Sequence, residues 1–232
     1  MAGSSVDGVF RNTLGLSQRF AELVCDERLL GPAYDFYGEQ TSLHGFDVLV
    51  RQPDRVRRSA WHFDGPRRLP YSSFSPSIPL VLKIGVWLTD VETAKAGAYQ
   101  FLPGSHRRAP TEIYNLEQDE QGQTDLLVRA GDVTIHHSDL WHRPTSSGDG
   151  TPRYSLFITY APSWIAPRET FAEVDLMGND RLATLLRCYP DPTARIKPPA
   201  QEAPLHPDAD LDLLRGDALG SAPLPYWIDH DS

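Results

Sequence analysis

The sequence predicts a mainly β fold, of the sandwich, barrel or jelly-roll kind, with flanking helices. Several short segments are rich in apolar, branched or aromatic residues and are separated by turn signals; they lie at 80–89, 98–102, 132–136, 140–145 and 153–161. Short strands spaced in this way are typical of closed or two-sheet all-β architectures. With 232 residues and no internal repeat, the chain is long enough for one domain with a single core.

The elements before and between these strands have weaker signals. Apolar residues at helical spacing predict a helix over 17–30, with Ser17 as its N-cap and Gly31 as its stop. A strand is expected over 46–50. The Pro- and Ser-rich segment 65–79 is expected to be a long loop, and the acidic, Gln-rich segment 112–125 a solvated insertion.

Beyond residue 162 the character of the sequence changes. Segments 170–177 and 181–188 are expected to form two short helices separated by a Gly-Asn-Asp breaker. The proline-rich stretch 190–204 is expected to be extended, and 208–215 to be one more short helix. We therefore expect a single domain over residues 1–232, with a barrel core at about 40–162 and a C-terminal extension at 163–232.

Composition excludes several classes of function. The formal net charge is −9, from 31 acidic and 22 basic residues, which argues against binding to nucleic acid or to an anionic membrane. The N-terminal residues lack the pattern of a signal peptide, and no apolar stretch reaches membrane-spanning length. The two cysteines, Cys25 and Cys188, lie far apart and have no metal-type spacing. We expect a cytoplasmic protein.

The string Trp61-His62-Phe63-Asp64-Gly65 carries the first chemical signal. Side chains alternate along extended backbone, so His62 and Asp64 point to the same side of it. Two imidazoles and one carboxylate on one face of a metal leave coordination positions open, as in non-haem Fe(II) oxygenases. The third ligand must come from further along the chain, where His136, His137 and His142 are the candidates.

Arg153 carries the second signal. With a period of two along the expected strand, Arg153, Ser155, Phe157 and Thr159 share one face. An arginine that faces into a barrel needs an anionic partner, because an unpaired buried charge is costly. A carboxylate fits its planar fork, and Ser155 could donate a further hydrogen bond. This pair suits the distal carboxylate of a 2-oxo dicarboxylate whose other end chelates iron.

With these residues in their order, the sequence resembles the phytanoyl-CoA dioxygenase family of Fe(II)/2-oxoglutarate-dependent oxygenases. The matching motifs are Trp-His-Phe-Asp-Gly at 61–65, Val-Trp-Leu-Thr-Asp at 86–90, Leu-Pro-Gly-Ser-His at 102–106, Gly-Asp-Val-Thr-Ile-His-His at 131–137, and Trp-His-Arg-Pro at 141–144 followed by Arg153. The resemblance extends over about 46–160, and the combination of motifs is far more specific than any one of them.

The resemblance implies a double-stranded β-helix (jelly roll) in which His62, Asp64 and His142 bind Fe(II). It also implies that Arg153 and Ser155 hold 2-oxoglutarate, with Lys83 as a further cofactor-site candidate. The implied activity is a dioxygenase that uses O2, releases succinate and CO2, and hydroxylates an unactivated C–H bond of a small molecule. Asp64 favours hydroxylation, desaturation or cyclisation over halogenation, since related halogenases replace this carboxylate with a small residue.

Two other functions stay open: a cupin-type metalloenzyme that does not use 2-oxoglutarate, and a non-catalytic binding protein with a degenerate site. Correspondingly, His62 and Asp64 could form a hydrogen-bonded surface pair, and Arg153 a structural ion pair. Trp61, Phe63 and Trp141 fit a substrate pocket and ordinary core packing equally well. His44 is expected at the surface. No segment of the sequence specifies the substrate.

Overall fold

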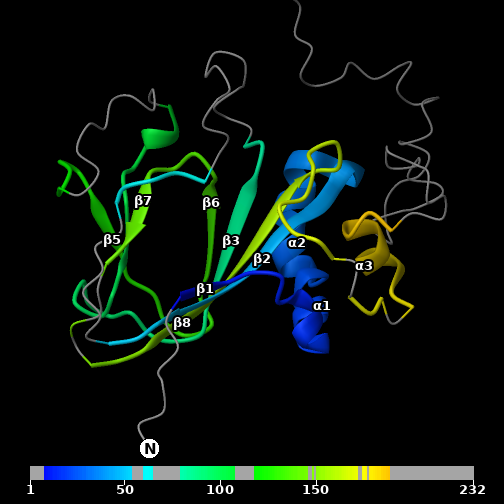
Figure 1. Cartoon of the computed structure of the whole chain (residues 1–232). Coiled ribbons are helices and arrows are strands. Elements are labelled where there is room, and N and C mark those ends of the chain that lie inside the picture. Colours follow the sequence, from blue (N-terminus) through cyan, green and yellow to red (C-terminus); the bar gives the residue numbers. More distant parts are fainter. Residues whose placement is uncertain are drawn as a thin grey trace, which may run out of the picture.

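Two antiparallel sheets make up most of the structure, which confirms the mainly β prediction (Figure 1). This computed structural model describes residues 8–53, 60–64, 79–107, 118–145, 148, 150–171, 174–176 and 178–188. The larger sheet has the strand order β1-β2-β8-β3-β6, and the smaller sheet the order β5-β4-β7. The strands are β1 Gly8–Phe10, β2 Thr41–Arg51, β3 Leu82–Trp87, β4 Tyr99–Phe101, β5 Thr124–Leu126, β6 Val133–His137, β7 His142–Pro144 and β8 Arg153–Pro162.

The helices and the smaller sheet lie on opposite sides of the larger sheet (Figure 1). The helices are α1 Gln18–Val24, α2 Glu27–Tyr37 and α3 Asp180–Leu185, with short 3-10 turns at Leu14–Leu16, Gly38–Gln40 and Ser105–Arg107. Their apolar side chains pack on one face of β2, β3 and β8 and form the largest buried cluster. A second cluster, around Trp87, Tyr99 and Phe157, fills the space between the two sheets. No helix in the described part of the chain is long and apolar enough to cross a membrane.

The alternation predicted for β8 is confirmed. Leu156, Ile158 and Tyr160 belong to the cluster under the helices, whereas Phe157 belongs to the cluster between the sheets. Arg153 and Ser155 therefore face the space between the sheets, because side chains of one parity share a face. In this register Ser155 pairs with Trp87 of β3 and with Leu49 of β2.

The prediction of one helix over 17–30 that stops at Gly31 is wrong. The chain forms two helices, because Asp26 is extended (ψ 124°) and its carboxylate accepts a hydrogen bond from the Arg28 amide at 2.9 Å, which starts α2. Gly31 and Pro32 lie inside α2. Burial of Leu29, Leu30 and Ala33 against the sheet outweighs the poor helix propensity of this pair. Ser17 caps α1, as expected.

Other boundaries also differ from the expectations. The strand expected over 46–50 is part of the longer β2, and the insertion expected over 112–125 contains the start of β5. In segment 170–177 the described residues are not helical, whereas the second expected helix is present as α3. The loop 65–79 lies almost wholly outside the described residues, as do 190–204 and 208–215.

We predict that Gly85→Ala destabilises the protein. A Cβ at Gly85, in the middle of β3, would lie 2.7 Å from Thr134 Oγ1 and 2.8 Å from the Phe157 ring. Because the ring is packed between the sheets, the clash should cost about 1–3 kcal/mol of unfolding free energy. Thermal unfolding followed by circular dichroism measures this as a lower Tm.

Gly31→Ala is the matched control, since a Cβ there meets nothing within 4 Å and its φ is not positive. In a helix this change should leave stability equal or raise it by about 0.5–1 kcal/mol. Equal melting temperatures for Gly85→Ala and the wild type would contradict the packing described between the sheets.

Candidate active site

Three side chains that could bind a metal converge at the edge of the smaller sheet: His62, Asp64 and His142. One ligand atom from each lies within 4.8 Å of the other two. The backbones of His62 and His142 form an antiparallel bridge, with N···O distances of 3.0 and 2.8 Å. The amide of Asp64 donates to the carbonyl oxygen of Ser138 at 2.8 Å, which fixes the third member. The convergence is thus built on backbone hydrogen bonds.

Both imidazoles are oriented by a backbone carbonyl oxygen at Nδ1, which leaves Nε2 to bind a metal. Nδ1 of His62 lies 2.9 Å from the carbonyl oxygen of Ala60, and Nδ1 of His142 lies 2.8 Å from that of Leu140. A carbonyl oxygen only accepts, so each Nδ1 carries a proton, and Nε2 is the nitrogen whose lone pair is available to a metal when the ring is neutral. Hydrogen bonds of this kind orient metal-binding histidines. The donor set is thus two Nε2 atoms and one carboxylate, which fits Fe(II) in a facial triad.

Lys83 of β3 is the charged partner of Asp64. Its Nζ lies 2.5 Å from Asp64 Oδ2, and His142 Nε2 lies 3.6 Å from the same oxygen. Burial opposes ionisation of Asp64, but Lys83, His142 and His62 outweigh it and hold the pKa of the carboxyl well below its usual range. Burial is also the main cause that lowers the pKa of His142. The cluster therefore holds an ionised carboxylate and a neutral His142 imidazole at neutral pH.

Of the three histidines considered as the third ligand, only His142 belongs to this group among the described residues. His136 lies next to it, with ring centroids 5.9 Å apart, but its Nε2 lies 3.2 Å from the hydroxyl of Tyr99. Burial, reinforced by Lys83, lowers the pKa of His136 to about 3. His137 points to the other face of β6 and stacks on His106 at 5.2 Å.

Tyr99 is a site residue that sequence reasoning missed. Its ring stacks on His142 at 4.8 Å with an interplanar angle of 17°. Burial raises the pKa of its phenol well above the usual range, Asp64 raises it further and Arg153 lowers it. The phenol therefore lies within electrostatic range of both the triad and Arg153. Tyr99 belongs to no recognisable motif. Its position in the expected strand 98–102 predicts that it is buried, but not that it lies beside the metal ligands.

Arg153 and Ser155 lie buried between the sheets, with 2% and 1% of their surface exposed. The Arg153 guanidinium donates to the carbonyl oxygen of Gly97 and lies 5.7 Å from the centre of the Trp87 ring. Ser155 Oγ is buried and has no hydrogen-bond partner in the described part of the chain. A buried hydroxyl without a partner is costly, and an oxygen-rich ligand beside Arg153 would satisfy it.

A second cluster missed by the sequence surrounds Arg143, which directly follows His142. Arg143 is buried, stacks on the Trp61 ring at 4.5 Å and donates from Nε to the side chain of Gln100 at 2.9 Å. It also donates to the carbonyl oxygen of Gln118 at 3.0 Å and forms an ion pair with Asp119. Arg143, itself in β7, therefore links Gln118 and Asp119 to Gln100 of β4.

The aromatic residues beside the triad are mainly core residues. Trp61, Phe63, Leu102 and Trp141 form a buried cluster of their own, and the rings of Phe63 and Trp141 meet edge to face at 5.0 Å. Phe63 also lines the cavity next to Asp64. Phe63 therefore both packs in the core and lines the cavity.

That cavity has a volume of about 210 Å³ and adjoins the triad through Asp64. Its walls also include Lys83 and Thr159 from the larger sheet, together with His44 and Arg168. From the sequence, His44 is expected at the surface, but the structure places it in the wall of this cavity. It is partly buried, and its backbone carbonyl accepts a hydrogen bond from the Arg168 amide.

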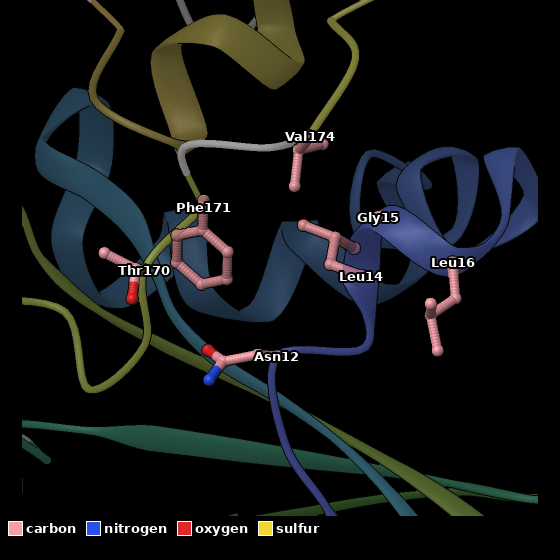
Figure 2. A pocket seen from close by; sticks show the side chains of 7 residues that line it. All are labelled: Asn12, Leu14, Gly15, Leu16, Thr170, Phe171 and Val174. Carbon is pink, nitrogen blue, oxygen red and sulfur yellow. The ribbon is translucent and has the colours of Figure 1, made fainter.

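A larger cavity, of about 480 Å³, lies on the helix side, between the Leu14–Leu16 turn and the segment after β8 (Figure 2). Leu14, Phe171 and Val174 point toward it, and Asn12 and Thr170 are its polar members. None of the described residues that line it is ionisable or a good metal ligand. The chemistry is therefore better sought at the triad.

Comparison with known proteins gives the family. A sequence model described as phytanoyl-CoA dioxygenase matches residues 2–149, more than half of the chain, including His62, Asp64 and His142. Arg153 lies just beyond this match. No protein of curated function matches the sequence.

Solved structures share the fold at low identity. HygX from Streptomyces hygroscopicus, with nickel and 2-oxoglutarate bound, has a TM-score of 0.59 and 21% identity, over 69% of this chain and 74% of HygX. SnoN, a non-haem α-ketoglutarate-dependent epimerase from nogalamycin biosynthesis, has a TM-score of 0.53 and 24% identity, over 74% of this chain and 68% of SnoN. The chain belongs to the phytanoyl-CoA dioxygenase family and is a non-haem iron, 2-oxoglutarate-dependent enzyme.

Proposed function

We propose that this enzyme is a hydroxylase, which inserts oxygen into an unactivated C–H bond of a small molecule and releases succinate and CO2. The observation that carries the proposal is the convergence of His62, Asp64 and His142 within 4.8 Å. Asp64 supports hydroxylation, or a related desaturation or cyclisation, over halogenation, because its carboxylate occupies the position that a halide would need. HygX has been crystallised with hygromycin B bound, which favours a small-molecule substrate here too.

In this proposal, Nε2 of His62, Nε2 of His142 and one carboxylate oxygen of Asp64 hold Fe(II). When bound, the metal and 2-oxoglutarate supply the oxidising chemistry with O2. The carbonyl oxygens of Ala60 and Leu140 fix the two imidazole rings through Nδ1. Lys83 serves the cofactor site through Asp64, since its ammonium keeps this carboxylate ionised and fixes one of its oxygens.

Arg153 and Ser155 are assigned to the distal carboxylate of 2-oxoglutarate. Support comes from their burial between the sheets and from the buried Ser155 hydroxyl that has no partner among the described residues. Charge-assisted hydrogen bonds from a guanidinium to a carboxylate are among the strongest in proteins. The rings of Trp87, Tyr99 and Phe157 pack around this region and exclude water from it.

The two sheets fit the two halves of a double-stranded β-helix, and we assign the chain to that jelly-roll fold. Its core corresponds to about 40–162, in a single domain over 1–232. Two structural features support this assignment. The triad lies where β7 pairs with the His62 segment, and Arg153 is the first residue of β8, the next strand along the chain. Such barrels bring residues that are distant in sequence together at their mouth.

Asp64→Ala should abolish metal-dependent turnover. Loss of one of three ligands should weaken Fe(II) binding by more than the ~10–100-fold that is typical for losing an outer hydrogen-bond partner. The measurements are anaerobic titration with Fe(II) and 2-oxoglutarate, followed by visible absorption, and release of succinate. Asp35→Ala, on the exposed side of α2, is the control. Undiminished succinate release in Asp64→Ala would overturn the triad assignment.

Arg153→Ala should raise the KM for 2-oxoglutarate while Fe(II) binding stays close to that of the wild type. A lost hydrogen bond to a charged group is worth about 1.5–3 kcal/mol, which corresponds to roughly tenfold or more in KM. Steady-state kinetics with succinate detection measures it, and the exposed Arg129→Ala is the matched control.

Ser155→Ala tests the same anchor with a smaller change to the buried core. It should raise the KM for 2-oxoglutarate by about tenfold or more, because a hydrogen bond to a charged carboxylate is worth about 1.5–3 kcal/mol. An unchanged KM for 2-oxoglutarate in both Arg153→Ala and Ser155→Ala would overturn the assignment of these two residues to its distal carboxylate.

A further inference from the structure

The cavity beside Asp64 contains an arginine that the reaction chemistry does not require. Arg168 lies in the segment after β8, far from the metal-binding motifs in sequence, and lines the cavity together with Arg11, Lys83 and Thr159. The volume of about 210 Å³ is below the range of about 300–1,000 Å³ that is usual for drug-sized ligands. It suits a small acid or the end of a longer molecule.

Arg168 is held in a defined position. Its amide donates to the carbonyl oxygen of His44 at 2.8 Å, and its Nη2 lies 2.8 Å from Asp47 Oδ2 and 2.9 Å from Glu169 Oε1. The two carboxylates are almost fully buried, with side-chain exposures of 4% and 2%. Glu169 is itself fixed, because its other oxygen accepts hydrogen bonds from the amides of Asn12 and Phe46.

The backbone of β2 leaves room for this guanidinium. The β2–β8 pairing shifts register between Leu43 and Gly45, and a Cβ at Gly45 would lie only 2.5 Å from Arg168 Nη2. Glycine at this position therefore allows Arg168 to lie directly against the strand. The guanidinium of Arg168 is therefore held in one position by the strand and by the two carboxylates.

Both carboxylates contact Nη2, so other donors of Arg168 are left over. In the described part of the chain, no hydrogen bond or ion pair involves its Nε or Nη1. Thr159, 4% exposed, lines the same cavity, and its hydroxyl has no hydrogen-bond partner among the described residues. Among the described residues that line the cavity, Arg11, Lys83 and Arg168 are cationic and Asp64 is the one carboxylate. Asp64 is already paired with Lys83, and Arg11 lies 3.8 Å from Asp47.

We propose that this cavity is a substrate subsite for an anionic group, a carboxylate or a phosphate, bound by the free donors of Arg168 and the hydroxyl of Thr159. Asp47 and Glu169 offset the charge of Arg168, so recognition depends on directed hydrogen bonds as well as on charge. The proposal rests on the hydroxylase function above. It places the anionic group of the substrate in the cavity that Asp64 lines, and therefore close to the carbon that reacts at the metal.

Binding of small probes tests the subsite without knowledge of the natural substrate. The protein is first loaded with Ni(II) and 2-oxoglutarate, which fill the metal and co-substrate sites and block Arg153. Isothermal titration calorimetry then measures benzoate, phenyl phosphate and the uncharged methyl benzoate. We expect saturable binding of at least one anion, and binding at least about tenfold weaker for the ester. The stronger anion identifies the carboxylate or the phosphate as the preferred group.

Three variants locate the binding. Arg168→Lys retains a charge for Asp47 and Glu169 but removes the Nε and Nη1 donors, and should weaken anion binding at least about fivefold. Gly45→Ala displaces the guanidinium without a change of charge, and Thr159→Val removes the hydroxyl; both should weaken the anion in the same direction. Arg129→Lys, on the exposed loop before β6, should bind it as the wild type does.

Each outcome has one meaning. Failure of the wild type to bind Ni(II) and 2-oxoglutarate counts against the proposed function itself. Normal loading without saturable binding of either anion overturns the subsite alone. Equal binding of acid and ester, or unchanged anion binding in both Arg168→Lys and Gly45→Ala, overturns it as well.

Discussion

The backbone bridge between His62 and His142 is the interaction on which the rest of the site depends. Two hydrogen bonds join residues that are 80 positions apart and set the distance between the two imidazoles before any metal binds. Each imidazole then receives its orientation from a carbonyl oxygen two residues earlier in the chain. Asp64, Lys83 and Tyr99 are arranged around this pair, so the ligand geometry is a property of the backbone more than of side-chain packing.

Strand β8 contributes side chains to both buried clusters, the one under the helices and the one between the sheets. One parity of its residues packs under the helices, and the other parity faces the space between the sheets, where Arg153, Ser155 and Phe157 lie. The strand pairs on both sides, with β2 and with β3, so its side chains are held in fixed positions. An anchor for a dicarboxylate needs this rigidity, because a guanidinium loses less entropy on binding when it is already placed.

The sequence predicted those parts of the fold and site that depend on local pattern. Period-two alternation identified the faces of β8, and the spacing of His62 and Asp64 identified one side of a strand. It did not predict the continuation of α2 through Gly31 and Pro32, because the burial of Leu29 and Leu30 is a tertiary effect. Tyr99 and Arg168 belong to no motif, and the Trp-His-Arg-Pro motif that contains Arg143 does not reveal its contacts. Each of the three has a partner more than forty positions away: His142 for Tyr99, Gln100 for Arg143 and Asp47 for Arg168. A lone histidine such as His44 has no sequence pattern that would reveal its backbone hydrogen bond to Arg168 or its place in the cavity wall.

The network around Arg143 has an evolutionary consequence. This side chain stacks on Trp61, next to one histidine of the triad, follows the other in sequence, and bonds to residues between Gln118 and Gln123. Segments beside an active site are where enzymes usually diverge, because loops tolerate change. Here a substitution at Asp119 or Gln123 would be transmitted to the metal ligands, so this stretch is not free to drift. New substrate preferences are more accessible through residues on the cavity wall, such as Thr159, whose hydroxyl has no hydrogen-bond partner among the described residues.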